Sequence, residues 1–165
     1  MPILDERSLE FLSHSPEQTR RLGTRLGEGV AEGDVICLAG DLGAGKTTLA
    51  QGIARGWGAL QAITSPTFVL INEYRRADAS MLYHVDAYRL SGPGEAEGIG
   101  LHELFTAGHP VILEWPERVA ECLPSDRLTI ALSWVDESRR RLRFEAEGER
   151  YVQWLRDYRK TAFGG

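Results

Sequence analysis

The sequence predicts an α/β fold, a three-layer sandwich in which helices cover a mixed central sheet. One observation is a strand, a glycine-rich loop and a helix in direct succession between residues 34 and 56. Another is a series of further short apolar runs, some joined as hairpins and some separated by helical patterns. The chain has 165 residues, 42% of them hydrophobic, which suits a single domain spanning residues 1–165.

The chain begins with a strand and a helix. Residues 3–12 suit a short strand. Ser15 then gives an N-cap, Pro16 occupies the first helical position, and a glutamine follows three residues after the cap. This pattern predicts a helix that ends near Gly33. Its buried stripe recurs every four residues: Leu22, Leu26, Val30.

Residues 40–47 match the phosphate-binding pattern G-x-x-x-x-G-K-[ST] without a mismatch. Glycines let several backbone N–H groups point into one concavity, and the following helix adds its positive end. Lys46 brings a charge to the outer phosphates, and the Thr47 hydroxyl is a hard ligand suited to Mg²⁺. The apolar run 35–38 and a helix ending at glycines near residue 58 give the expected context. We therefore expect a fold like that of P-loop NTPases.

The second half supplies the remaining strands. Residues 69–74 and 81–86 suit a hairpin, a short helical region falls within 95–105, and residues 110–114 suit a buried strand. Two further strands and a last helix complete the fold, with a loose tail after it: strands 126–135 and 139–145, helix 149–160, tail about 160–165.

Two predicted strands end in a carboxylate, Asp86 and Glu114. Ligands of open α/β sheets lie at the carboxyl ends of the strands, so both acids are expected to face the phosphates. We assign Glu114 to the metal and Asp86 to the surrounding shell or the attacking water, with the exchange left open. His84 shares the face of Asp86 and suits either a hydrogen bond in the site or the core. Trp115 suits core packing, a wall of the nucleotide site or a partner contact.

Ser65 and Thr67 flank Pro66 at the start of a predicted strand. Proline at that position has a purely structural explanation. The alternative is a switch loop whose two hydroxyls sense the terminal phosphate.

Composition excludes several classes of protein. The net charge of −5 and pI of about 5.4 argue against a surface built to grip nucleic acid, and arginine runs such as 139–143 are expected to be solvated. The two cysteines lack metal-ligand spacing, and no run is long and apolar enough to span a membrane. We expect a cytoplasmic protein.

Five blocks resemble the bacterial TsaE (YjeE) family in order and spacing, over about residues 13–145: GDLGAGKTT at 40–48, TSPTF at 64–68, NEY at 72–74, HVDAYRL at 84–90 and LEWPE at 113–117. Many relatives carry a larger residue than Ala87, which leaves the neighbouring acid intact. The resemblance implies an ATPase needed to make threonylcarbamoyladenosine in tRNA, with ATP and Mg²⁺ as cofactors. It also implies association with TsaD and TsaB, with tRNA reached through that complex.

The resemblance implies roles for particular residues. Lys46, Asp86 and Glu114 are the expected catalytic residues, and Thr47 and Glu114 the expected metal ligands. Ser65, Thr67 and Trp115 are expected switch or partner contacts. The expected nucleotide contacts are Leu42, Gly43, Ala44, Gly45, Lys46, Thr47, Thr48 and Asp86, with Pro16 and Arg139 at the adenine end.

Two other functions use the same cradle. A small-molecule kinase would also need an acceptor pocket and an arginine-bearing lid, for which Arg89 and residues 92–98 are the candidates. A nucleotide-sensing module would bind without meaningful catalysis. The strand-terminal acids favour chemistry over sensing.

Overall fold

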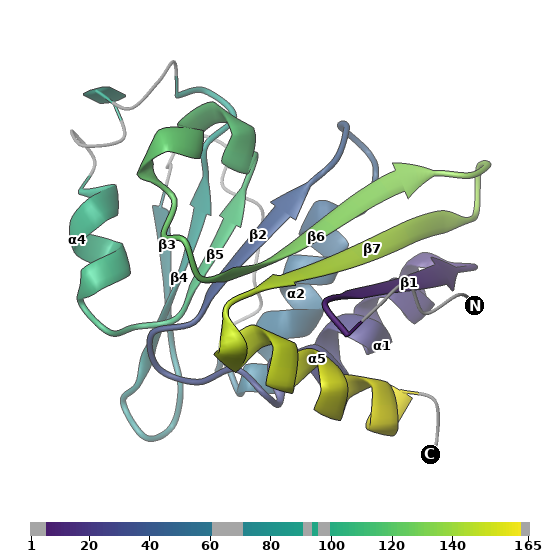
Figure 1. The fold of residues 1–165 in the computed structure, drawn as a ribbon, viewed down its shortest axis with the longest axis horizontal. Coiled ribbons are helices and arrows are strands. Elements are labelled where there is room, and N and C mark those ends of the chain that lie inside the picture. The colour runs from purple at the N-terminus through teal and green to yellow at the C-terminus, as the bar shows by residue number, and fades with distance from the viewer. Residues whose placement is uncertain (1–5, 61–70, 91–93, 96–99, 163–165) are drawn as a thin grey trace.

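A computed structural model describes residues 6–60, 71–90, 94–95 and 100–162, and Figure 1 shows the arrangement of its elements. The elements in chain order are β1 (Ser8–Ser13), α1 (Pro16–Gly27), β2 (Val35–Ala39), α2 (Lys46–Trp57), β3 (Ile71–Arg75), β4 (Met81–Asp86), α4 (Leu101–Thr106), β5 (Val111–Glu114), the 3-10 helix η1 (Pro116–Cys122), β6 (Arg127–Trp134), β7 (Arg140–Glu147) and α5 (Glu149–Ala162).

The described strands form one mixed seven-stranded sheet in the order β1-β7-β6-β2-β5-β4-β3. β2 is parallel to both of its neighbours, β5 and β6, and β5 is also parallel to β4. The remaining pairs, β1 with β7, β6 with β7 and β3 with β4, are antiparallel. The predicted α/β fold with a mixed sheet is confirmed.

Helices cover the sheet on two faces. One core packs α1, α2 and α5 against residues such as Ile36, Ile130 and Phe144. The second core packs α4 and η1 against Cys37, Val85 and Leu113. Since neighbouring residues of β2 belong to different cores, the sheet is the middle layer of three. Figure 1 shows α4 and η1 over the β3–β5 side, away from α1 and α5.

The start of α1 has the predicted cap. The Gln18 N–H donates to the Ser15 hydroxyl at 3.1 Å, and the Gln18 side chain accepts from the His14 N–H at 2.8 Å. The expected end near Gly33 is wrong, because α1 ends at Gly27. A separate turn follows, in which the Ala31 N–H donates to the Asp34 carboxylate at 2.7 Å.

Four glycines bring α1 and α2 into close contact. A Cβ on Gly27 would lie 2.0 Å from the Ile53 carbonyl oxygen, and one on Gly56 would lie 1.9 Å from that of Thr24. Gly23 and Gly52 face the partner helix's backbone in the same way. Sequence reasoning assigned Gly56 to the helix end, whereas it lies inside α2. The C-cap is Gly58 alone, with φ 107°.

Most other elements lie where the sequence places them. The hairpins β3–β4 and β6–β7 and strand β5 are confirmed. The last helix is longer than expected, because α5 continues to Ala162 where a tail was predicted to begin near residue 160. None of the described helices is long and apolar enough to cross a bilayer.

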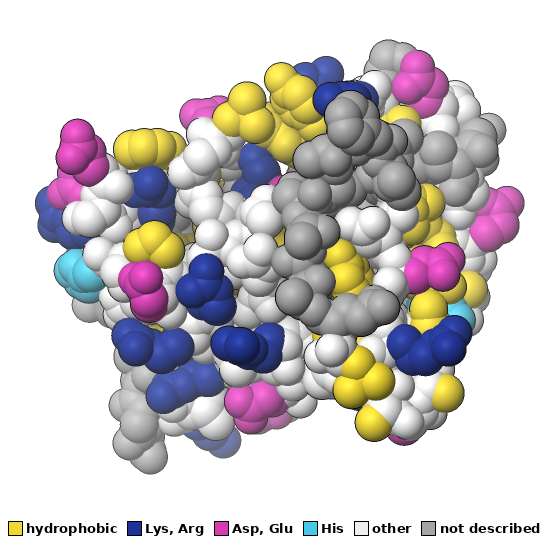
Figure 2. Space-filling view, turned by 180° about the vertical axis from the view of Figure 1, so that it is seen from behind, with side chains coloured by type: hydrophobic (Ala, Val, Ile, Leu, Met, Phe, Trp, Pro, Cys, Tyr) yellow, Lys and Arg dark blue, Asp and Glu magenta, His cyan; other side chains and the backbone are white. Residues whose placement is uncertain are grey.

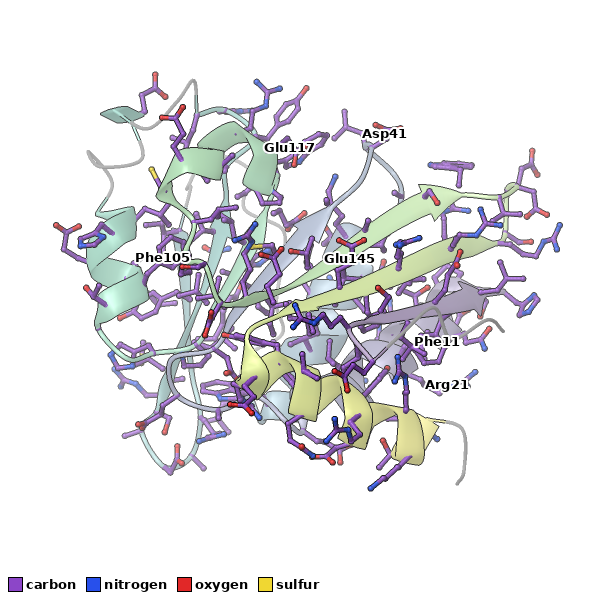
Figure 3. The ribbon with its side chains drawn as sticks, in the orientation of Figure 1. Phe11, Arg21, Asp41, Phe105, Glu117 and Glu145 are labelled. Carbon is purple, nitrogen blue, oxygen red and sulfur yellow. The ribbon has the colours of Figure 1, made fainter. Side chains whose placement is uncertain are left out.

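Basic side chains share their surfaces with acids. Figure 2 shows several Lys and Arg side chains gathered on one part of the rear face with Asp and Glu beside them, and Arg21 projects from α1 in Figure 3. The arginine run on and before β7 is paired with carboxylates, as expected of a solvated face. The pairs are Arg139–Asp136 at 2.6 Å, Arg141–Glu10 at 2.8 Å and Arg143–Glu145 at 3.0 Å.

Candidate functional site

The loop between β2 and α2 takes a path that only glycine permits at several points. Gly40, Gly43 and Gly45 have φ values of 137°, 79° and 107°. A Cβ on Gly40 would also lie 2.4 Å from the Leu132 carbonyl oxygen, so the loop leaves β2 in contact with the backbone of β6. These glycines let the backbone curl directly at the carboxyl end of a central strand.

Helix α2 begins at Lys46, and its N-cap, Gly45, has no side chain to bond the first amides. The first turn also carries no acidic residue. The free N–H groups and positive end of the helix dipole therefore remain available to an anion. Gly23, Gly27, Gly52 and Gly56 fix this helix against α1, which holds the anion site in place.

A cavity of about 280 Å³ opens beside this helix end. Figure 3 shows Asp41, in the loop after β2, and Glu117, in η1, at the same end of the sheet. Among the described residues, the cavity is lined by Leu42, Gly43, Gly45, Lys46, Thr47, Thr48, Asp86, Tyr88, Glu114 and Trp115.

The two predicted acids lie side by side. Asp86 and Glu114 are register partners at the ends of the parallel strands β4 and β5, so both project from the same face of the sheet. Glu114 is 3% exposed, and its Oε2 lies 2.6 Å from His84 Nε2. Burial raises the pKa of the Asp86 carboxyl, although the Tyr88 N–H, which donates to Asp86 Oδ1 at 2.9 Å, opposes that shift.

Lys46 is 5% exposed and bonded to its own loop. Its ammonium donates to the carbonyl oxygens of Gly40 and Asp41, and it lies 3.6 Å from the centre of the Trp115 ring. Burial lowers the pKa of Lys46, while nearby carboxylates, Glu114 foremost, oppose that change. Trp115 has the left-handed conformation, φ 62°, that a bulky residue rarely adopts. This conformation follows Glu114 directly and places the indole beneath the lysine.

The structure brings most predicted site residues together. Ala44 belongs to the loop but is fully buried, so it offers the cavity backbone only. Pro16 and Arg139 are not among the described residues that line the cavity, and their role at an adenine end stays a prediction. Ser65 and Thr67 lie outside the described residues.

Sequence reasoning missed two contributions to the site. Tyr88 lines the cavity and packs on Trp115, with ring centres 4.9 Å apart. Arg140, rather than Arg139, approaches the loop, since its guanidinium donates to the Gly43 carbonyl oxygen at 3.5 Å and stacks on Trp134 at 3.8 Å. The aromatic Tyr88 two residues after a strand-terminal acid was the one available signal.

The oxygen ligands available here suit Mg²⁺. The Thr47 hydroxyl and the Asp86 and Glu114 carboxylates all line the cavity. In the part of the chain that the structure describes, no three His, Cys, Asp or Glu side chains form a metal-binding group. A few protein oxygens beside a phosphate cradle are the arrangement typical of Mg²⁺, which takes most of its remaining ligands from phosphate and water.

Comparison with known proteins assigns the family. The model of the family described as Threonylcarbamoyl adenosine biosynthesis protein TsaE matches residues 13–142. The TsaE protein of Bacillus subtilis is 37% identical over 145 residues, covering 88% of this chain and 90% of that protein. The Nostoc protein is 42% identical over 142 residues, covering 83% and 85%.

Solved structures agree with the sequence matches. The crystal structure of Bacillus subtilis YdiB superimposes with a TM-score of 0.79 at 32% identity, and the match covers 94% of this chain and 97% of that one. The same chain therefore shares with these proteins both its sequence, over the phosphate loop and the acidic strand ends, and its fold. It belongs to the TsaE family of threonylcarbamoyladenosine biosynthesis proteins.

Proposed function

We propose that the protein is a Mg²⁺-dependent ATPase that supports threonylcarbamoyladenosine modification of tRNA together with TsaD and TsaB. The observation that carries the ATPase proposal is the position of Asp86 and Glu114 beside the phosphate loop and the free N-terminus of α2. Oriented amides, a lysine and two carboxylates in one cavity suit phosphoryl chemistry. The cytoplasmic location expected from the sequence belongs to the same proposal.

Each group has a distinct part in the proposed hydrolysis. The loop amides and the first turn of α2 would bind the phosphate oxygens. Lys46 would leave its loop carbonyls and place its charge on the outer phosphates, where negative charge is spread in the transition state. Asp86 is half-buried and would orient the attacking water by accepting a hydrogen bond from it.

Thr47 and Glu114 would hold the Mg²⁺ ion, as the sequence predicts. The bound ion would supply positive charge at the phosphate oxygens. Tyr88 and Trp115 would limit access of bulk water on the side where their rings stack.

Family membership supports the pathway, and the partners follow from the resemblance. Because the matched relatives are described as tRNA threonylcarbamoyladenosine biosynthesis proteins, we assign ATP turnover to that process. The experiment is steady-state release of phosphate with and without purified TsaD and TsaB. We expect partner-dependent stimulation, together with loss of tRNA modification when this chain is omitted.

Lys46→Ala tests the site itself. Loss of the lysine removes a charge required at the outer phosphates, and we expect phosphate release to fall at least 100-fold, a loss on the scale of removing one charge-stabilising donor. Lys160→Ala is the matched control, because Lys160 is exposed near the end of α5. Equal turnover in a well-folded Lys46→Ala protein would refute the assignment, and transfer of labelled phosphate to a metabolite would point to a kinase.

A further inference from the structure

His84 is a fully buried polar residue for which the proposed hydrolysis gives no role. It lies in β4, is 0% exposed, and its Nε2 is 2.6 Å from Glu114 Oε2. Asp86, level with Glu114, lies two residues further along β4 at the open end of the sheet. His84 therefore contacts Glu114 from the interior side, opposite the direction from which a nucleotide would approach.

The unbonded nitrogen of the ring indicates where the hydrogen lies. Within the described residues, His84 Nδ1 is buried and has no hydrogen-bond partner. A hydrogen on Nδ1 would be a buried donor without an acceptor, whereas a bare Nδ1 leaves only an acceptor unpaired. The Nε2–H arrangement instead directs the donor at the Glu114 carboxylate. The bond is thus His84 Nε2–H to Glu114 Oε2.

This bond separates two opposite charges. Glu114 is the first-ranked of the carboxylates whose charge acts on Lys46, yet the Lys46 ammonium is bonded to loop carbonyls. A glutamate side chain has three rotatable bonds and would, without an anchor, be free to turn toward the ammonium. An ion pair between them would occupy the two groups that the phosphates and the cation need.

We infer that His84 is a positioning residue, which holds Glu114 Oε2 from the interior and leaves Oε1 to serve the divalent cation in the cavity. The inference rests on the proposed function, since it assigns a means of orientation to the proposed metal ligand. Groups that ligate metals are commonly held by a hydrogen bond from behind, and loss of that bond typically weakens the metal 10- to 100-fold.

The experiment compares His84→Leu, which fills the buried space without a donor, with His84→Gln, whose amide retains one. Affinity for a fluorescent ADP analogue is measured in EDTA and during titration with Mg²⁺, and thermal unfolding is followed for each variant. We expect His84→Leu to raise the Mg²⁺ concentration for half-saturation 10- to 100-fold and to leave affinity in EDTA unchanged. His84→Gln should recover most of the loss.

Coupling distinguishes positioning from a merely structural role. In a Glu114→Gln background, His84→Leu should have no further effect on the Mg²⁺ requirement, because its target is already gone. An unchanged Mg²⁺ requirement in His84→Leu, or an equal loss in both backgrounds, overturns the inference while leaving the ATPase proposal intact. Absence of nucleotide binding by the unaltered protein would instead refute the proposed function, and this inference with it.

A measurement on the unaltered protein covers the case in which His84→Leu does not fold. The ¹⁵N shifts of the four histidines report which ring nitrogen carries the hydrogen. We expect Nε2 of His84 to be protonated. A bare Nε2 would overturn the inference, whatever the variants show.

Discussion

Gly56→Ala tests the close contact between α1 and α2. The new Cβ would lie 1.9 Å from the Thr24 carbonyl oxygen, a distance that must grow to at least 3.0 Å. The obstructing atom belongs to a helix backbone and cannot rotate away, so the helices must separate. Overpacking of this kind costs about 1–3 kcal/mol, while alanine gains about 1 kcal/mol over glycine in helix propensity. Since backbone is involved, we expect a net loss of about 2 kcal/mol.

Calorimetry is the direct assay for this loss. For a domain of this size, about 2 kcal/mol corresponds to a Tm lower by roughly 4 to 8 °C. Gly94→Ala is the matched control, because Gly94 is exposed and a Cβ there would meet nothing within 4 Å. The control should change stability by no more than about 0.5 kcal/mol. A Gly56→Ala protein that melts at or above the wild-type temperature would refute the packing argument.

Two further predictions concern the cap of α1 and the response to alkali. Ser15→Ala removes the acceptor of the Gln18 N–H, so urea unfolding should show a loss of about 1 kcal/mol, and an unchanged midpoint would contradict the cap. Burial raises the pKa of the Cys37 thiol from 9.0 to about 12. The unfolded chain therefore loses this proton first, so stability is retained below pH 9 and falls as the pH rises toward 12. Cys37→Ala should make urea midpoints between pH 9 and 10.5 fall less steeply, and an identical slope would exclude Cys37 as the cause.

Local chemistry explains what could be predicted from the sequence. The cap at Ser15 and the glycine-rich loop depend on residues a few positions apart, so their spacing carries the information. Glu114 could be predicted as a strand-terminal acid for the same reason. The end of α1 was misplaced because Val30 continues the apolar spacing after the helix has stopped.

Long-range contacts explain what could not. The bond from His84 to Glu114 depends on the pairing of β4 with β5, which lie 30 residues apart. Gly56 was assigned to a helix end because its real partner, the Thr24 backbone, lies on another helix. Arg140 reaches Gly43 across 97 positions of the chain. Such contacts become visible only once the strand order is known.

The ammonium of Lys46 rests on the indole of Trp115 while bonded to carbonyls of its own loop. Any polyanion that recruits this lysine must break those contacts, so the measured affinity is a net exchange rather than a simple gain. Departure of a cation from an aromatic surface also alters the light that the ring emits. One of the chain's four tryptophans is thereby an internal dye for the moment at which the cradle fills.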